Sequence, residues 1–257
     1  MKVHIGLFLL LLVCPAFASQ PDTHNTSNPF IAYSSLLLQW DYLNKLGPVN
    51  HYLTLNIQPS VPFHLNQQVD LLLYSDLPVN SEMKMIYTNA PAMQLGDYQQ
   101  FLFFSPANTG NLYFGVGPIF SFPTATTSVL ASEKWGIGPA LQAAYFGEKV
   151  AYGVIGYYLC SYAGNPNRPN ISRTYWNPWL TYNLDTFNNV GIQSEPYVNF
   201  MTGQVQIPLE AYYNHFILLN NDPVKFTFDG LYWPVAPNYF PSWSLRFNIT
   251  LMVPRKY

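Results

Sequence analysis

The chain of 257 residues is long enough for one domain, carries a formal net charge of −2, and has only 9% charged residues against 17% aromatic residues. Soluble domains usually have about 25% charged residues, disordered segments are highly charged and poor in aromatics, and nucleic-acid binding needs a basic surface. These figures exclude a disordered chain and a nucleic-acid-binding protein. They favour a protein whose exterior meets something other than water.

The first 18 residues have the pattern of a signal peptide. Lys2 and His4 precede the apolar run from Ile5 to Val13, and the sequence AFA at 16–18 forms a small-residue cleavage site. This apolar run is too short to span a bilayer, which takes about 20 residues as a helix. We therefore predict a cleaved signal peptide over 1–18, a periplasmic segment over 19–32 and one barrel domain over 33–257.

The rest of the chain alternates apolar and polar residues with the period of β-strands rather than helices. In the last such segment, Trp243, Leu245, Phe247, Ile249 and Leu251 share one face, and polar side chains share the other. About twelve strands are predicted, at 33–44, 50–65, 68–79, 94–105, 111–122, 134–146, 149–162, 173–184, 189–200, 204–218, 223–235 and 242–253.

The length of these segments and the links between them predict a membrane barrel. Strands of soluble proteins have about five or six residues, whereas an 11-residue strand tilted by about 45° spans the apolar band of about 25 Å of an outer-membrane barrel. The links alternate between short turns and longer loops, and an even strand number places both termini in the periplasm. The fold class is thus all-β, a closed antiparallel transmembrane β-barrel, in preference to a soluble β-sandwich. Aromatic residues of the apolar face lie near strand ends, where interfacial girdles are expected: Trp40, Tyr42, Trp135, Tyr145, Tyr152 and Trp243.

Every charged residue inside a predicted strand shares the polar parity, which faces the lumen in a closed barrel. Among them are the acids Asp41, Asp70, Asp76, Asp97, Glu195, Glu210 and Asp229 and the bases Arg173, Lys225 and Arg246. Folding the last hairpins about their turns brings Glu195, Glu210 and Arg246 to one level, with Arg173 and Asp229 nearby. This lumen charge cluster is either a network that fills the barrel or a constriction that favours cations.

Several glycines with the parity that faces the lumen lie on three consecutive predicted strands. They are Gly115, Gly117, Gly136, Gly138 and Gly153. They serve either strand curvature and close packing or a thin wall that leaves a passage open.

A search for catalytic and metal sites gives no candidate. No serine nucleophile has a parity that suits His215, no histidine pair has metal-ligand spacing, and the mature chain has one cysteine, Cys160. We therefore expect no enzymatic activity, no metal site and no cofactor.

Several segments resemble one protein family. They include "NPFIAYSSLLLQWDY", "LNIQPSVPFHL", "GVGPIFSFPTATTSVLASEKWGIGPA" and "WSLRFNITLMVPRK", which together extend from about residue 28 to the C-terminus. They look like the recurring blocks of a group of Gram-negative outer-membrane proteins labelled as transporters, related to the barrels linked with the meta-pathway of phenol degradation. The resemblance implies a barrel and suggests transport, without ligand residues. Tyr257 stands where many outer-membrane barrels end in Phe.

The sequence thus predicts a porin-like barrel in the outer membrane of a Gram-negative bacterium. Its function is that of a narrow channel or transporter for small solutes with an acid-rich lumen. The alternative is a filled structural or surface-interaction barrel that acts through its extracellular loops. The expected partners are outer-membrane lipid and lipopolysaccharide, the barrel assembly machinery during biogenesis, and a small solute that the sequence does not identify.

Overall fold

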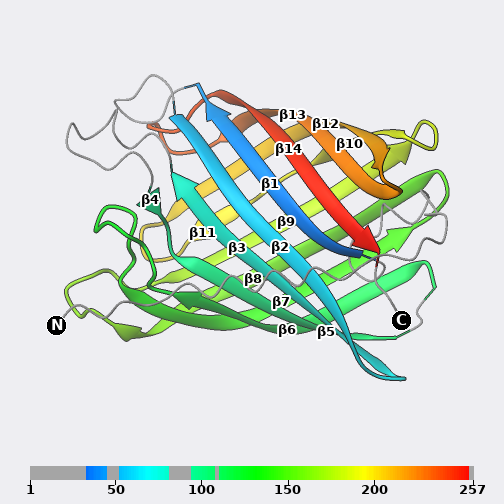
Figure 1. Ribbon diagram of the computed structural model, residues 1–257. Coiled ribbons are helices and arrows are strands. Elements are labelled where there is room, and N and C mark those ends of the chain that lie inside the picture. The colour runs from blue at the N-terminus through cyan, green and yellow to red at the C-terminus, as the bar shows by residue number, and fades with distance from the viewer. Residues whose placement is uncertain (1–32, 45–51, 81–93, 108–109, 255–257) are drawn as a thin grey trace.

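The computed structural model describes residues 33–44, 52–80, 94–107 and 110–254, and these form a barrel of antiparallel strands (Figure 1). The predicted signal peptide and periplasmic segment lie outside the described residues. The strands are β1 Tyr33–Leu43, β2 Tyr52–Asn66, β3 Val69–Asn80, β4 Gln94–Leu95, β5 Tyr98–Pro106, β6 Leu112–Phe122, β7 Lys134–Phe146, β8 Val150–Gly164, β9 Ser172–Asn183, β10 Asn188–Gln193, β11 Tyr197–Asn199, β12 Gln204–Leu219, β13 Asp222–Val235 and β14 Trp243–Pro254. No helix occurs among these elements.

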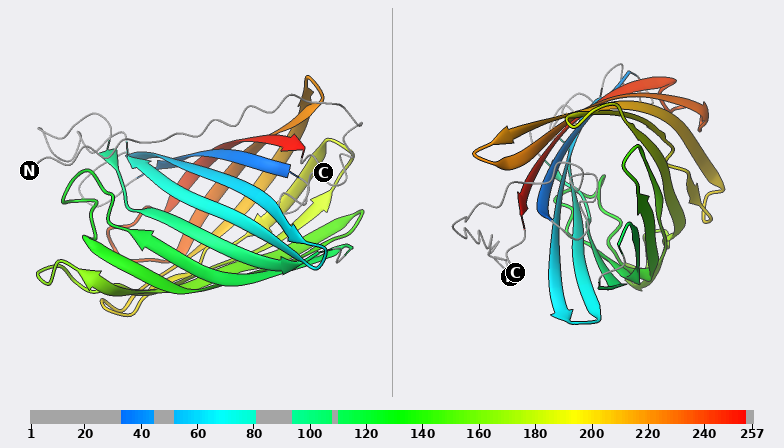
Figure 2. Two further views of the ribbon diagram at one scale, coloured as in Figure 1. Left: turned by 60° about the horizontal axis from the view of Figure 1, so that its bottom comes forward. Right: turned by 90° about the vertical axis from the view of Figure 1, so that its right-hand side faces the viewer.

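The fourteen elements occupy twelve strand positions. β4 and β5 both pair with β3, and β10 and β11 both pair with β9 and β12 in one continuous register, so each couple is one interrupted strand. The first and last strands pair along their whole length, from Tyr33 opposite Pro254 to Leu43 opposite Ser244. This pairing closes the sheet, and the strands form a ring when the molecule is viewed from its end (Figure 2). The predicted closed antiparallel barrel of twelve strands is confirmed.

Short turns join the strands at the end where β1 begins and β14 ends, which we call the terminal end. Asn220 and Asn221 have φ angles of 50° and 72° between β12 and β13, as a tight hairpin turn requires. Between β9 and β10, the carboxylate of Asp185 accepts hydrogen bonds from the backbone N–H groups of Phe187 and Asn188. The opposite end, where β1 ends and β14 begins, is called the loop end.

Apolar side chains cover the outside of the barrel. In β6, Leu112, Phe114 and Val116 are 52%, 43% and 57% exposed, whereas Tyr113 between them is 1% exposed. Aromatic pairs flank this surface at both ends: Tyr42 and Trp243 lie 6.2 Å apart at the loop end, and Tyr145 and Tyr152 lie 5.4 Å apart at the terminal end. An apolar band between two aromatic belts is the exterior of a transmembrane barrel.

Inward-facing residues fill one side of the barrel. β3, β5, β6, β7 and β8 contribute a buried apolar cluster of Leu72, Phe101, Phe103, Ile119, Ala140 and Leu159. The inward glycines belong to this packed wall, because a Cβ added to Gly117 or Gly138 would lie 1.8 Å or 1.7 Å from a carbonyl oxygen of the neighbouring strand. For Gly115, Gly136 and Gly153 the nearest atom would be 3.0 Å away or closer. The glycines therefore serve close packing and leave no passage beside them.

Candidate functional site: the interior cavities and the Arg246 cluster

An inner cavity of about 510 Å³ occupies the barrel interior. Its carboxamide lining, as we call it, consists of Gln39, Asn56, Gln58, Gln99, Gln142, Asn177, Asn189, Gln193, Asn214 and Asn248. Its aromatic lining consists of Tyr74, Phe101, Tyr157, Tyr175, Trp179, Tyr212 and Phe216. Its charged residues are Asp41, Asp76, Glu195, Lys225, Asp229 and Arg246.

A second, outer cavity of about 310 Å³ includes residues from the loop end of the barrel. It is lined by Arg173, Tyr175, Glu195, Tyr197, Gln204, Gln206, Pro208 and Trp233. Arg173 lies next to the first residue of β9, and Gln204 is the first residue of β12, both at the loop end. Tyr175 and Glu195 line both cavities. These two side chains therefore mark the level at which the two cavities are adjacent.

Arg246 binds three carboxylates at this level. Its Nε donates to Asp41 Oδ1 at 2.5 Å, and Nη1 and Nη2 donate to the two oxygens of Glu195 at 2.9 Å and 3.2 Å. Nη1 also donates to Glu210 Oε2 at 3.1 Å. The planar guanidinium can serve three acids because its five N–H groups point in different directions. We call Arg246, Asp41, Glu195 and Glu210 the Arg246 cluster.

Strand register explains how these side chains meet. Arg246 on β14 lies directly opposite Asp41 on β1. Glu210 reaches the arginine from β12, and Glu195 lies between β10 and β11. The cluster is buried: 8% of the Arg246 side chain and none of the Glu210 side chain are exposed. A charge at such a depth is tolerated only when it is paired and hydrogen-bonded.

Neighbouring carboxamides complete the shell of the cluster. Gln39 donates to Asp41 Oδ2 at 2.9 Å, and Gln193 donates to Glu210 Oε1 at 2.5 Å. Asn177 donates to Glu195 Oε1 at 3.5 Å. The three acids thus accept hydrogen bonds from an arginine and from amides, which fixes their orientation.

The other two residues of the predicted cluster, Asp229 and Arg173, do not bind Arg246. Asp229 lies opposite Arg246 on β13, and its side chain accepts a hydrogen bond from Asn248 at 3.1 Å instead of binding the arginine. Arg173 lines the outer cavity at the start of β9, away from the contacts of Arg246. Asp41 joins the cluster although nothing in the sequence groups it with Arg246. The only signal was its inward parity.

The remaining predicted lumen acids have separate surroundings. Asp76 lines the inner cavity and accepts a hydrogen bond from Gln58 at 3.3 Å. Asp70 pairs with His64 at 2.9 Å near the terminal end of the β2–β3 hairpin. Asp97, between β4 and β5, lines neither cavity; it accepts hydrogen bonds from the backbone N–H of Ala125 at 3.1 Å and from that of Ser132 at 2.8 Å. Its carboxylate therefore anchors the loop that connects β6 to β7.

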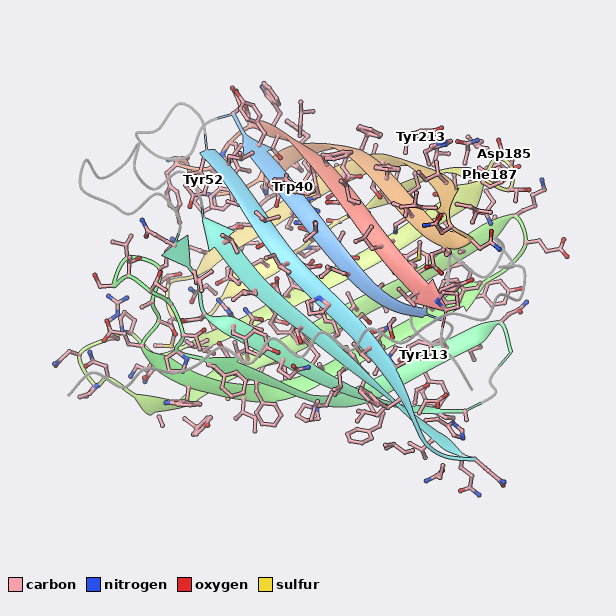
Figure 3. The ribbon with its side chains drawn as sticks, in the orientation of Figure 1. Trp40, Tyr52, Tyr113, Asp185, Phe187 and Tyr213 are labelled. Carbon is pink, nitrogen blue, oxygen red and sulfur yellow. The ribbon has the colours of Figure 1, made fainter. Side chains whose placement is uncertain are left out.

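His215 belongs to a polar group at the terminal end, on the outward parity of β12. Its Nδ1 lies 2.8 Å from Asn188 Oδ1, which also accepts a hydrogen bond from the Tyr213 hydroxyl at 2.5 Å. Asn188 in turn donates to Asp185 at 2.9 Å and, together with the Phe187 N–H, lowers the pKa of that exposed carboxyl. Figure 3 shows Tyr213, Asp185 and Phe187 together at this end. In the described part of the chain, no serine, threonine or cysteine side chain is hydrogen-bonded to His215. Nor do the described residues contain a group of three or more histidines, cysteines or acids that could hold a metal ion.

The described residues contain no helix long and apolar enough to cross a membrane. No protein-family description matches the chain. No curated protein matches it either. The comparison with solved structures, in contrast, finds outer-membrane barrels.

An outer-membrane channel from Pseudomonas putida F1 superposes with a TM-score of 0.62 at 13% sequence identity, over 87% of this chain and 96% of that one. The NanC porin gives a TM-score of 0.51 at 9% identity, over 86% and 100% of the two chains. Outer membrane phospholipase A from Escherichia coli gives 0.52 at 11% identity, over 88% and 93%. The chain therefore has the fold of outer-membrane β-barrels, a fold found in channels, porins and at least one enzyme.

Proposed function

We propose that this protein is a narrow outer-membrane channel for small solutes, whose acid-rich interior favours cations at the Arg246 cluster. The observation that carries the proposal is a buried charge cluster whose Glu195 lines two adjacent cavities. Pores that select ions by charge place rings of like-charged side chains at a narrow level. Here three acids surround one arginine, and one of these acids, Glu195, lines both cavities.

The charged residues that line the two cavities also favour cations. Asp76 and Asp229 line the inner cavity in addition to the cluster, and Lys225 and Arg173 are the further bases. Carboxylates therefore outnumber cations along the two cavities. The channel and porin folds of the similar structures fit this proposal, although the phospholipase shows that the same barrel can carry another activity.

We also propose where the protein is located and which partners it has. A barrel with an apolar band belongs in lipid, and the N-terminal pattern suggests export by a signal peptide into the outer membrane of a Gram-negative bacterium. The barrel assembly machinery would insert it, and outer-membrane lipid and lipopolysaccharide would surround it. The relation to the phenol-degradation barrels stays a prediction.

A second candidate function is a filled barrel that acts through its loops. The buried apolar cluster on the β3–β8 side favours it, because that cluster removes part of the interior from any solute path. Contacts between two loop-end connections also favour it: Arg168 ion-pairs with Glu133 at 3.6 Å and donates to the backbone carbonyl of Ser128 at 2.7 Å. These contacts give the loop end a defined surface.

Single-channel recording in a planar bilayer tests the two candidates. The purified parent protein should conduct, and a salt gradient should give a reversal potential that indicates cation preference. Glu195→Gln should reduce that preference, and Arg246→Ala should increase it. Arg168→Ala, on a loop-end connection, serves as the control and should leave the reversal potential unchanged.

Folding of each variant is checked by heat-modifiable migration on gels. A correctly folded parent that is silent in the bilayer would refute the channel and favour the filled barrel. A conducting parent whose reversal potential ignores both Glu195→Gln and Arg246→Ala would refute the role of the Arg246 cluster as the selective level.

A further inference from the structure

Several polar atoms in the wall of the inner cavity have no hydrogen-bond partner among the described residues. Gln142 is only 2% exposed, yet within the described part of the chain neither its amide nitrogen nor its amide oxygen has a hydrogen-bond partner. The same holds for Asn248 Oδ1, Thr250 Oγ1 and Asp229 Oδ1. All four residues line the inner cavity. Buried polar groups are almost always hydrogen-bonded, so these atoms point to a partner within the cavity.

The residues that carry these atoms lie on strands at opposite sides of the barrel. Gln142 lies on β7 and Thr250 on β14, and these strands are six positions apart in either direction around the twelve-position ring. Gln142 is four residues from the end of β7 at Phe146, and Thr250 is four residues from the end of β14 at Pro254. Both strand ends are at the terminal end. The unpartnered groups therefore occur on two opposed walls of the same half of the barrel.

The rest of the lining indicates the chemistry of the occupant. A carboxamide offers two donors and one acceptor oxygen, which suits a hydroxyl because a hydroxyl both donates and accepts. The carboxamide lining defined above supplies such groups from many strands. Phe101, Tyr175 and Trp179 add broad apolar faces to the cavity. A volume of about 510 Å³ lies within the usual range of about 300–1,000 Å³ for small-molecule sites.

We propose that the inner cavity is a binding site for a neutral polyhydroxylated solute, such as a small polyol or a monosaccharide, held between Gln142 on one wall and Asn248 and Thr250 on the other. This inference rests on the proposed channel function, because it names the class of solute that would pass. Hydroxyl groups on both sides of a ring would satisfy the opposed walls, and its apolar faces would contact the aromatic side chains.

Binding of D-glucose to the purified, detergent-solubilised protein tests the proposal, measured by saturation-transfer NMR, which detects millimolar affinity. The parent should bind saturably, and tetraethylammonium, a cation without hydroxyl groups, should not displace the glucose. Gln142→Leu should weaken binding about tenfold or more, since a site built for hydroxyls loses its partner groups. Gln204→Leu is the matched control, because Gln204 lines only the outer cavity, and it should bind as the parent does.

Heat-modifiable migration again verifies folding, and Thr250→Val provides a second test from the opposite wall if Gln142→Leu does not fold. Absence of saturable glucose binding by the folded parent would overturn the proposal. So would displacement of glucose by tetraethylammonium, or undiminished binding by the folded wall variants. Conductance without glucose binding would overturn this inference and leave the channel standing, whereas glucose binding by a silent barrel would support the site and refute the channel.

Discussion

Arg246 connects three strand positions through its side chain. It is paired with Asp41, Glu195 and Glu210 inside the barrel, where each partner has lost most of its water. Removing one partner from such a network is costly because charges of the other sign stay buried without compensation. The arginine therefore stabilises the barrel whether or not solutes pass it.

Replacing Arg246 tests this role. Arg246→Ala should lower the free energy of unfolding by about 3–5 kcal/mol, the range for breaking a buried pair, measured by urea denaturation in lipid vesicles. Adding Glu210→Gln should recover part of the loss, because that acid is the most deeply buried of the three. A double variant no more stable than Arg246→Ala would contradict the electrostatic explanation.

Gly138 is the clearest case of a position set by a close backbone approach. A Cβ there would lie 1.7 Å from the carbonyl oxygen of Tyr158, and a backbone oxygen can move only with its strand. Gly138→Ala should therefore destabilise the barrel by about 1–3 kcal/mol, as overpacking does. Gly230→Ala is the control, because nothing lies within 4 Å of its added Cβ. Equal unfolding midpoints in urea for the two variants would refute this account.

At the scale of the strands, alternation predicts most of the fold. The outward parity of Leu245 and Phe247 against the inward parity of Arg246 identifies β14, and the connection 236–242 joins it to β13. Alternation does not reveal interruptions: the predicted strand at 94–105 is broken at Gly96 and Asp97, and that at 189–200 is broken at 194–196. In both segments, the residues on either side of the break pair with the same neighbouring strands. The alternation of apolar and polar residues therefore does not show the break.

The candidate site was harder to predict from the sequence, because one of its contacts depends on closure of the sheet. Folding β12, β13 and β14 about their connections at 220–221 and 236–242 puts Glu210 and Arg246 at one level. No turn joins β1 to β14, which are paired only because the sheet closes. The contact between Asp41 and Arg246 is therefore invisible to any argument from hairpins, although it is the shortest ion pair of the cluster.

The loop that connects β6 to β7 is held by residues at the break between β4 and β5. Asp97 binds the N–H groups of Ala125 and Ser132, and the Thr126 N–H donates to the Leu95 carbonyl at 3.0 Å. Asp97→Ala should release this loop and make it about tenfold more sensitive to added protease, since the lost hydrogen bonds to a charged acceptor contribute about 1.5 kcal/mol or more.

Asp185→Ala provides the matched control for that experiment. Asp185 also holds backbone N–H groups with its carboxylate, but at the β9–β10 turn of the terminal end. Its loss should leave cleavage within 123–133 unchanged. Protection of that loop in Asp97→Ala equal to that of the parent would show that the carboxylate does not anchor it.

At the scale of the whole molecule, the effect of an outward-facing residue depends on its depth in the bilayer as well as on its polarity. Outward side chains are apolar along the strands, and aromatic pairs mark both ends. In a bilayer, the cost of an outward charge should follow its distance from the two aromatic belts. Two valines of similar exposure make this measurable: Val116, near the middle of β6, is 57% exposed, and Val253, next to the end of β14, is 54% exposed.

Val116→Arg should reduce the free energy of unfolding in phospholipid vesicles by about 2–4 kcal/mol, whereas Val253→Arg should reduce it by about 0–1 kcal/mol. The difference arises because an arginine in the middle of the apolar band must deform the bilayer or lose its water, and one at the edge reaches the headgroups. Urea denaturation of both variants in the same vesicles gives the comparison. Equal losses would mean that the strands do not cross the bilayer as their apolar surface indicates, and the two cavities would then not form a route through a membrane.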